Sequence, residues 1–322
     1  MQVETVRGRA AGAPPGIVLD MINASNLTKR YGSHVAVDTV SFSCEAGSIT
    51  GFLGPNGAGK STTLRMLTGL TPPTSGSVSI AGSAYADLPN PGRLVGVMLD
   101  AAAQHPGRTG LETLRLAARL LGMRPTRAGD MLERVGLADA GDRRVGNYSL
   151  GMRQRLGIAA ALMGDPAVLV LDEPANGMDP EGIRWMRGLL REFAAGGGTV
   201  LLSSHLLGEV QATVDRLVVI GDGRIVADDS LAHLLAGTGT VVRAVDITAL
   251  AAALERAGFQ PSRRDDGSLR VAATAEQVGR VAADSGAVLL ELGEGGGLEE
   301  LFFTLTRGAR TAGAPAAAVA AA

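Results

Sequence analysis

The sequence predicts an α/β fold built on a parallel sheet, followed by a smaller α+β domain. Three short apolar runs, at 167–171, 199–202 and 216–220, have the length and composition of strands that are covered on both faces. Helical segments separate these runs, as in successive βαβ units. Beyond the Gly-Thr-Gly sequence at 237–239 the composition changes and two shorter strand-and-helix units follow. This change separates the second domain from the first.

The first domain is expected to begin after a flexible leader at residues 1–20, which contains arginines, glycines and a Pro-Pro pair. Period-2 character at 37–53 indicates strands that end in a glycine-rich turn. Leucine and methionine at three- and four-residue spacing indicate a helix from Gly59 onward. We expect the whole domain to span 21–237, with a strand at 94–99 and a helical subdomain at about 100–165.

The second domain is expected to be a small accessory α+β unit at residues 240–308. A glycine-rich loop precedes its last helix, at 298–305, and the Ala-rich tail at 309–322 is expected to be disordered. The other expected elements alternate, with strands at 241–246, 268–272 and 287–292 and helices at 248–257 and 275–285.

The charge balance bears on the partners of the chain. Its 322 residues, enough for about two domains, include 30 basic and 32 acidic side chains and carry a net charge of -2. Such a balance provides no overall basic surface of the kind that holds a nucleic acid backbone. We therefore expect no nucleic acid partner.

The single cysteine, Cys44, excludes a disulfide framework and a multi-cysteine zinc site. Its position at the end of an expected strand is typical of a small buried apolar residue. Residues 1–20 lack the continuous apolar core of a secretory signal, and no uncharged apolar stretch reaches about 18 residues. We therefore expect a protein of the reducing cytosol that does not span a membrane.

A glycine-rich segment between a strand and a helix fits the pattern G-x-x-x-x-G-K-[ST]. Glycines allow backbone N–H groups to approach a polyphosphate without obstruction by side chains. Lys60, at the start of the helix, is expected to bind the β and γ phosphates and to assist catalysis, and the Ser61 hydroxyl is placed to bind Mg²⁺. The sequence therefore predicts a site for ATP and Mg²⁺ formed by Gly54, Pro55, Asn56, Gly57, Ala58, Gly59, Lys60, Ser61 and Thr62.

Two carboxylates, Asp172 and Glu173, follow directly after the apolar run at 167–171. The carboxyl ends of parallel strands are where such sheets bind ligands. Asp172 is expected to bind Mg²⁺ opposite Ser61. Glu173, which faces a different direction, is expected to orient or deprotonate the attacking water as a general base.

Four further segments together resemble the ATP-binding subunits of ABC transporters. Residues 148–155 read YSLGMRQR and resemble the family signature, usually written LSGGQ, with Met152 at the glutamine place. Residues 176–180 resemble the D-loop, 203–205 resemble the segment that ends in the switch histidine, and Tyr31 resembles the aromatic residue that stacks on adenine. The motifs occur in the family's order over most of the first domain.

The resemblance implies a RecA-like P-loop NTPase core with an antiparallel β subdomain and a helical signature subdomain. It also implies a composite site, in which two cassettes meet head to tail with ATP between them. Ser149 and Gly151 of one cassette would then contact the γ-phosphate held by the other, which suits a hydroxyl and glycine amides at a helix N-terminus. The resemblance also implies that His205 hydrogen-bonds the same phosphate and that Asp179 of the D-loop contributes to nucleotide binding.

The resemblance implies two partners, a second copy of the cassette in a homodimer and an integral membrane permease on a separate chain. The protein would then be cytoplasmic and peripheral on the cytoplasmic face of the cell membrane. The signature and the C-terminal extension look most similar to those of bacterial drug or antibiotic-peptide export subunits.

One position departs from the family pattern. Counting back from Pro106 and Thr109, the place of the Q-loop glutamine is held by Asp100, and Gln104 lies too far along the chain to take that role. A carboxylate there adds negative charge near the expected triphosphate but offers an oxygen to Mg²⁺. Asp100 is therefore a candidate metal ligand.

Two alternative functions are considered beside the transporter. A soluble ABC ATPase that acts on ribosomes or nucleic acid would be expected to carry two cassettes, zinc cysteines or a long coiled-coil insertion, and this chain has none of these. A regulator without turnover would be expected to lack Glu173 or His205, and both are present. His34, His105 and His233 have no motif context and are interpreted as structural or surface residues.

Overall fold

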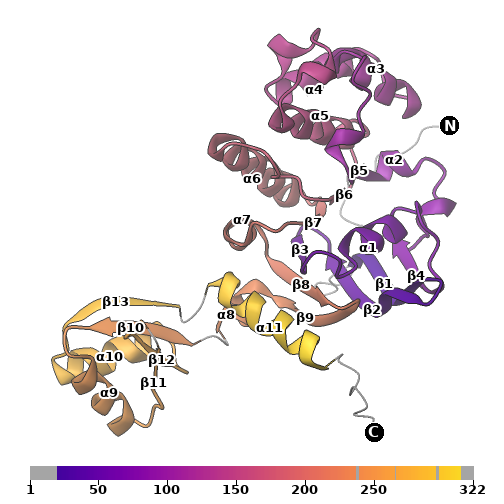
Figure 1. The fold of residues 1–322 in the computed structure, drawn as a ribbon. Helices are drawn as coiled ribbons and strands as arrows, with labels where there is room; N and C mark the ends of the chain where they lie inside the picture. The colour runs from indigo at the N-terminus through magenta and orange to yellow at the C-terminus, as the bar shows by residue number, and fades with distance from the viewer. Residues whose placement is uncertain (1–19, 237–238, 265, 295–296, 313–322) are drawn as a thin grey trace, which may run out of the picture.

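The computed structural model describes residues 20–236, 239–264, 266–294 and 297–312. The chain forms a larger domain, residues 20–236, and an accessory domain, residues 239–294, that projects from one side of it (Figure 1). The predicted leader, apart from Asp20, lies outside the described residues.

A six-stranded sheet in the order β5-β6-β7-β3-β8-β9 forms the centre of the larger domain. The first five strands in this order are parallel, and β9 is antiparallel to β8. Alternate residues of β6 enter two different cores, Val168 and Val170 on one face and Leu169 and Leu171 on the other. Burial on both faces explains the continuous apolar runs and confirms the predicted parallel sheet. The strands are β3 (Ile49–Leu53), β5 (Val95–Met98), β6 (Val168–Leu171), β7 (Thr199–Ser203), β8 (Arg216–Gly221) and β9 (Arg224–Ser230).

A three-stranded antiparallel sheet in the order β2-β1-β4 packs with α1 (Lys60–Leu67) against one face of the central sheet. Its strands are β1 (Asp20–Tyr31), β2 (His34–Glu45) and β4 (Ser75–Ile80). Cys44 of β2 is completely buried in the core between the two sheets. Burial in apolar surroundings raises the pKa of the Cys44 thiol to about 12.

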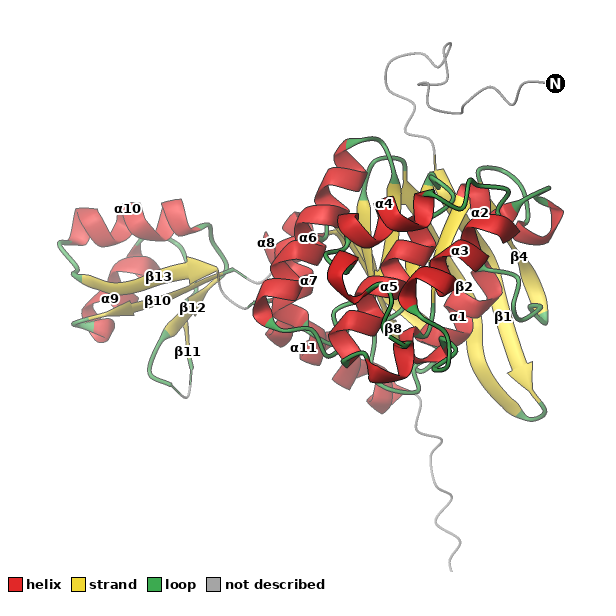
Figure 2. Ribbon diagram, turned by 90° about the horizontal axis from the view of Figure 1, so that it is seen from above, coloured by secondary structure: helices red, strands yellow, loops and turns green. Residues whose placement is uncertain are grey.

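Helices cover the other face of the central sheet and extend into the predicted helical subdomain (Figure 2). The first helix of that subdomain begins at a capping box, in which Thr109 and Glu112 each accept a backbone N–H of the other. Nowhere in the described ranges is a helix both long and apolar enough to cross a membrane. The helices after α1 are α2 (Pro91–Leu94), α3 (Gly110–Leu120), α4 (Arg127–Arg134), α5 (Leu150–Leu162), α6 (Pro180–Ala195), α7 (Leu207–Thr213) and α8 (Leu231–Ala236). Short 3₁₀ turns lie at 85–87, 101–103, 138–140 and 145–147.

The accessory domain is an antiparallel sheet in the order β11-β12-β10-β13 that packs with two helices around a separate core. Val242, Leu250 and Leu254 are completely buried in this core. The two-residue strand β11 has no counterpart among the expected elements. The elements are β10 (Thr240–Ala244), α9 (Ile247–Arg256), β11 (Ser262–Arg263), β12 (Leu269–Val271), α10 (Ala275–Ser285) and β13 (Leu289–Glu294).

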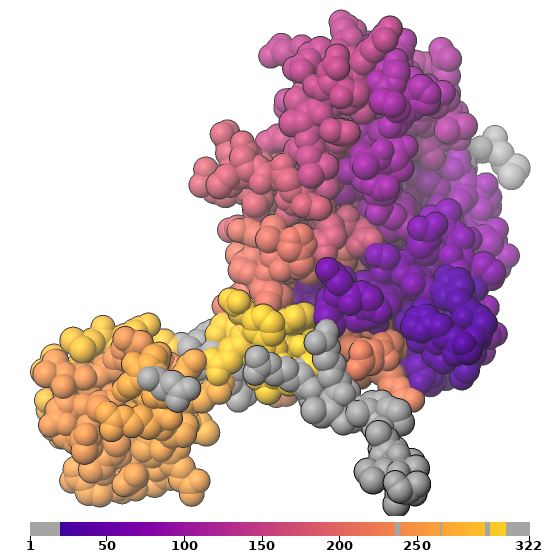
Figure 3. Space-filling view, in the orientation of Figure 1, coloured from indigo at the N-terminus to yellow at the C-terminus, as the bar shows by residue number. Residues whose placement is uncertain are grey.

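The last helix, α11 (Leu298–Ala312), returns from the accessory domain and packs on the larger domain against β8, β9, α7 and α8 (Figure 3). Leu298 is 1% exposed, and its N–H donates to Oε1 of Gln211 at 3.0 Å. The helix was expected within the accessory domain, but its apolar residues join the core of the larger one. It also covers 309–312 of the predicted disordered tail, and the rest of that tail lies outside the described residues.

Glu300 of α11 also connects the two domains. Its carboxylate pairs with two arginines of the accessory domain, Arg264 at 3.1 Å and Arg270 at 3.0 Å. All three side chains are about one-third exposed, so water partly screens these pairs. These two ion pairs therefore contribute little to the connection between the domains.

Leu298→Ala is expected to destabilise the larger domain by about 2–5 kcal/mol, because it opens a cavity under α11. The matched control is Leu120→Ala, since Leu120 is 75% exposed and its loss should change stability by less than about 0.5 kcal/mol. Urea unfolding followed by fluorescence of Trp185, the only tryptophan, reports on the core that Leu298 joins. Equal midpoints for the two variants would show that α11 adds nothing to this core.

Candidate functional site

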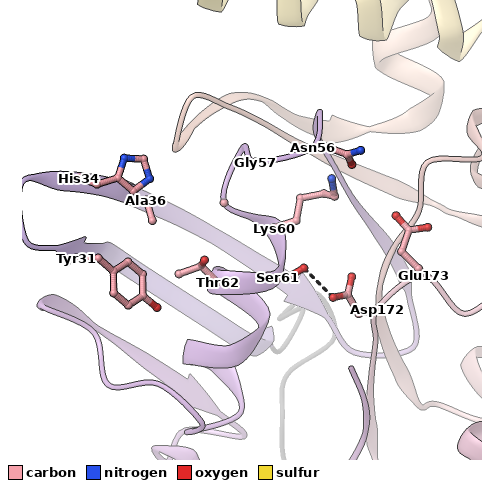
Figure 4. A pocket seen from close by; sticks show the side chains of 11 residues that line it. Tyr31, His34, Ala36, Asn56, Gly57, Lys60, Ser61, Thr62, Asp172 and Glu173 are labelled. Carbon is pink, nitrogen blue, oxygen red and sulfur yellow. Dashed lines mark hydrogen bonds between the residues drawn. The ribbon is translucent and has the colours of Figure 1, made fainter. Parts of the chain in front are cut away.

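The candidate site is a pocket at the carboxyl ends of β3 and β6, where the glycine-rich loop meets the two carboxylates (Figure 4). Six of the nine predicted loop residues and the end of the β1–β2 hairpin line this pocket, whereas Gly54, Pro55 and Ala58 are not among its lining residues. Its lining residues are Tyr31, His34, Ala36, Asn56, Gly57, Gly59, Lys60, Ser61, Thr62, Asp172 and Glu173.

Two glycines of the loop occupy places where no other residue fits. A Cβ on Gly54 would lie 2.4 Å from the carbonyl oxygen of Ile220, and a Cβ on Gly59 would lie 2.5 Å from that of Ala36. Gly59 also has a φ of 107°, a conformation that L side chains rarely adopt. Close packing on the neighbouring backbone therefore determines the curvature of the loop immediately before α1.

Lys60, the first residue of α1, extends its side chain back over the loop. Its Nζ donates to the carbonyl oxygens of Gly54 at 2.6 Å and Pro55 at 3.2 Å. Burial lowers the pKa of the Lys60 ammonium, and the nearby Glu173 and Asp172 carboxylates act in the opposite direction. The helix N-terminus and this cation thus face the same side of the pocket.

Ser61 and Asp172 lie together, as the sequence predicts. The Ser61 hydroxyl donates to Oδ2 of Asp172 at 2.9 Å (Figure 4). Asp172 is positioned by its backbone N–H, which donates to the Met98 carbonyl of the neighbouring strand at 2.7 Å. A hydroxyl and a carboxylate are hard oxygen ligands of the kind Mg²⁺ uses together with phosphate and water. The donor set therefore fits Mg²⁺.

Glu173 turns away from Asp172 because its backbone is left-handed, with a φ of 50°. This conformation costs a non-glycine residue about 1–3 kcal/mol. Oε2 of Glu173 accepts from the backbone N–H of His205 at 3.2 Å and lies 2.6 Å from Nδ1 of its ring. His205 is not one of the residues that line the pocket, so it reaches the site through Glu173.

Tyr31 lines the pocket from the end of β1 and is 51% exposed, with Nζ of Lys29 lying 5.1 Å from its ring centroid. His34 and Ala36, across the hairpin, line the same pocket. No motif includes His34, so the sequence predicts only a structural or surface residue, yet the structure places it in the pocket. Its nearness to Tyr31 in the chain is the one signal in the sequence that points to this place.

The predicted signature and D-loop residues lie outside this pocket and beside each other. Ser149 caps α5, its Oγ accepting from Met152 N at 3.2 Å. A Cβ on Gly151 would lie 3.1 Å from the carbonyl oxygen of Gly177 in the D-loop. Asp179 caps α6, its Oδ1 accepting from Gly182 N at 2.7 Å. Their contacts with nucleotide stay predictions.

Asp100 is not among the lining residues either. Its Oδ1 accepts from Ala102 N at 2.7 Å and caps the 3₁₀ turn at 101–103. Gln104, which follows this turn, donates from Nε2 to the Arg153 carbonyl of α5 at 3.0 Å. The described contacts of Asp100 are thus structural, and its role toward the metal stays a prediction.

Comparison with known proteins places the chain in a family. A family model described as ABC transporter matches residues 37–176. The bacitracin transport ATP-binding protein BcrA of Bacillus licheniformis is 41% identical over 217 residues, which cover 66% of this chain and 71% of that protein. The chain belongs to the ABC transporter ATP-binding proteins. It is therefore an ABC ATPase, as the motifs predict.

Other relatives of this ABC ATPase have related descriptions. The lantibiotic transport ATP-binding protein SrtF of Streptococcus pyogenes is 36% identical over 65% of this chain and 90% of its own. The Nod factor export ATP-binding protein I of Burkholderia orbicola (strain AU 1054) is 41% identical over 64% and 70%, respectively. A second family model, described as a domain of unknown function, matches residues 229–299 of the ABC ATPase.

Solved structures agree with the cassette fold. The ATP-binding subunit of an ABC transporter has a TM-score of 0.62 and 29% identity, and the match covers 66% of this chain and 91% of that one. A bacterial ABC transporter cassette in dimeric form has a TM-score of 0.59 and 25% identity over 66% and 99%. Both matches cover about two-thirds of the ABC ATPase, the share that the larger domain occupies.

The metal role of Asp100 is tested by Asp100→Asn, which keeps an acceptor for the Ala102 N–H but removes the charge. We expect ATP affinity to depend more steeply on Mg²⁺ in the wild type, because the carboxylate repels the bare triphosphate and attracts the metal. The control is Asp139→Asn, at an exposed aspartate outside the pocket. Equilibrium ATP binding over a Mg²⁺ titration distinguishes the roles, and superimposable curves would leave Asp100 a helix cap only.

Proposed function

We propose that two copies of this ABC ATPase hydrolyse ATP with Mg²⁺ and drive export of an antibiotic or peptide through a separate membrane permease. The relatives support the cargo class, since the names of two of them give bacitracin and lantibiotic transport. The direction of transport is supported by a third, which is named as a Nod factor export ATP-binding protein. The placement of Ser61, Asp172 and Glu173 around one pocket carries the proposal of hydrolysis.

In this proposal the glycine-rich loop binds the phosphates through its backbone N–H groups, and Lys60 adds the positive charge. Ser61 and Asp172 would hold Mg²⁺, which when bound supplies positive charge that neutralises the phosphates. Tyr31 stacks on the adenine from the edge of the pocket. All of these groups except Tyr31 lie in the segments that directly follow β3 and β6, at the same edge of the central sheet.

Glu173 is the proposed general base, the group that orients the attacking water and accepts its proton. A carboxylate in this role contributes about 10²–10⁴-fold to the rate. Its contact with His205 at 2.6 Å holds the side chain in one direction, away from Asp172. Two adjacent carboxylates can therefore serve different tasks, one at the metal and one at the water.

The second copy supplies the signature. Ser149 is exposed at the N-terminus of α5, a helix of 13 residues, and does not line the pocket of its own chain. A helix N-terminus with a serine hydroxyl and a glycine amide is suited to a phosphate. The dimeric form of a similar cassette supports the pairing. With a permease, the pair would lie on the cytoplasmic face of the membrane.

Glu173→Gln is expected to retain ATP binding and to lose nearly all turnover, because the amide keeps the hydrogen-bonding shape but cannot accept the proton. An ATP-dependent dimer should then accumulate on a sizing column. Glu192→Gln is the matched control, because the Glu192 side chain is 76% exposed on α6. Turnover of the Glu173 variant at the wild-type rate would show that Glu173 is not the general base.

Co-expression tests the partner. Produced alone, the ATPase should remain in the supernatant after ultracentrifugation, and with its permease it should sediment with the membranes and purify with that protein. The expectation follows from the described residues, which contain no helix suited to crossing a membrane. Purification with ribosomes or DNA instead, in the presence of the permease, would contradict the transporter role.

A further inference from the structure

We propose that Ser203 is a positioning residue that holds Asp172 and Glu173 in the orientations their two tasks require. The inference rests on the proposed function of this pocket. Ser203 is the last residue of β7, and the parallel pairing of Leu171 with Leu202 places it beside Asp172, at the point where β6 ends. The sequence motif includes Ser203 only as a neighbour of the switch histidine.

The Ser203 hydroxyl makes two hydrogen bonds in opposite senses. It donates to Oδ1 of Asp172 and accepts from the backbone N–H of Glu173 at 3.0 Å. The side chain is completely buried, so water does not compete for either bond. A hydroxyl has one proton and two lone pairs, and it can therefore serve a carboxylate and an N–H at once. Alanine can serve neither.

The hydrogen bond from Ser203 to Asp172 determines which carboxylate oxygen of Asp172 faces Ser61 and the proposed metal position. Oδ1 is occupied by Ser203, and Oδ2 accepts from Ser61 at 2.9 Å. Fixing Oδ1 therefore aims Oδ2 at the place where the metal would be held. Groups that orient a metal ligand in this way commonly change metal affinity by about 10–100-fold when they are removed.

The bond to Glu173 holds a backbone that local preference disfavours. Glu173 is left-handed at a φ of 50°, and its N–H and C=O are each held by a side chain, Ser203 at 3.0 Å and Gln154 at 3.3 Å. Loss of Ser203 leaves the N–H without this acceptor and releases one end of the turn. The Glu173 side chain would then lose its fixed direction toward His205.

The test compares Ser203→Ala with Ser203→Thr, which keeps the hydroxyl. The control is Thr199→Val at the other end of β7, which removes a buried hydroxyl that donates to the Glu45 carbonyl at 3.3 Å. For each protein, equilibrium binding of a fluorescent ATP analogue is titrated with Mn²⁺ as the metal probe, kcat is measured at saturating metal, and folding is checked by urea unfolding.

We expect Ser203→Ala to raise the Mn²⁺ midpoint about 10–100-fold, with nucleotide binding in the absence of metal unchanged and kcat reduced even at saturating metal. Ser203→Thr should recover the midpoint, and Thr199→Val should resemble the wild type. If folded Ser203→Ala has a Mn²⁺ midpoint within twofold of the wild type, or if Thr199→Val shifts the midpoint equally, the positioning role is overturned and the proposed function is not. If nucleotide binding by the wild type does not respond to Mn²⁺, both the positioning role and the proposed function are overturned.

Discussion

The parallel pairing of β3, β6 and β7 is the constraint on which the site depends. The three strands end at one edge of the sheet, so the glycine-rich loop, the two carboxylates and the switch segment leave the core side by side. Because both faces of the sheet are buried, the strands cannot slide without exposing one core or the other. The hydrogen bonds from Ser61 at the start of α1 and Ser203 at the end of β7 then connect both segments directly to Asp172.

The hydrogen bonds of the Ser61 and Ser203 hydroxyls and the left-handed turn at Glu173 restrict the motion of this edge of the sheet at the candidate site. Gly54 and Gly59 pack on neighbouring carbonyls, and Glu173 is held in a left-handed conformation that is unfavourable for a non-glycine residue. Tyr31 and Ser149 are exposed by comparison, as suits surfaces that meet a base or a second subunit. The buried, closely packed groups are thus those proposed to hold phosphate and metal, and the exposed groups are those proposed to contact adenine or a second subunit.

Most of the fold could be predicted because its signals are local. Apolar runs that are buried on two faces indicate a parallel sheet, and the glycine pattern specifies the loop that follows one of its strands. The destination of α11 could not be predicted, because an apolar stripe shows that a helix is covered but not by which domain. Asp100 shows the same limit in the site, since a carboxylate after a strand suits a cap and a metal equally. Ser203 required the pairing of β6 with β7, which no local pattern contains.

Cys44 gives this molecule a practical property. It is the only thiol in the chain, it lies completely buried between the two sheets, and its high pKa keeps it protonated at neutral pH. Since the thiolate is the reactive form, alkylating reagents meet an inert site in the native fold. A cysteine introduced on the surface can therefore carry a spectroscopic label without removal of the natural one. Slow modification of Cys44 itself would report separation of the two sheets.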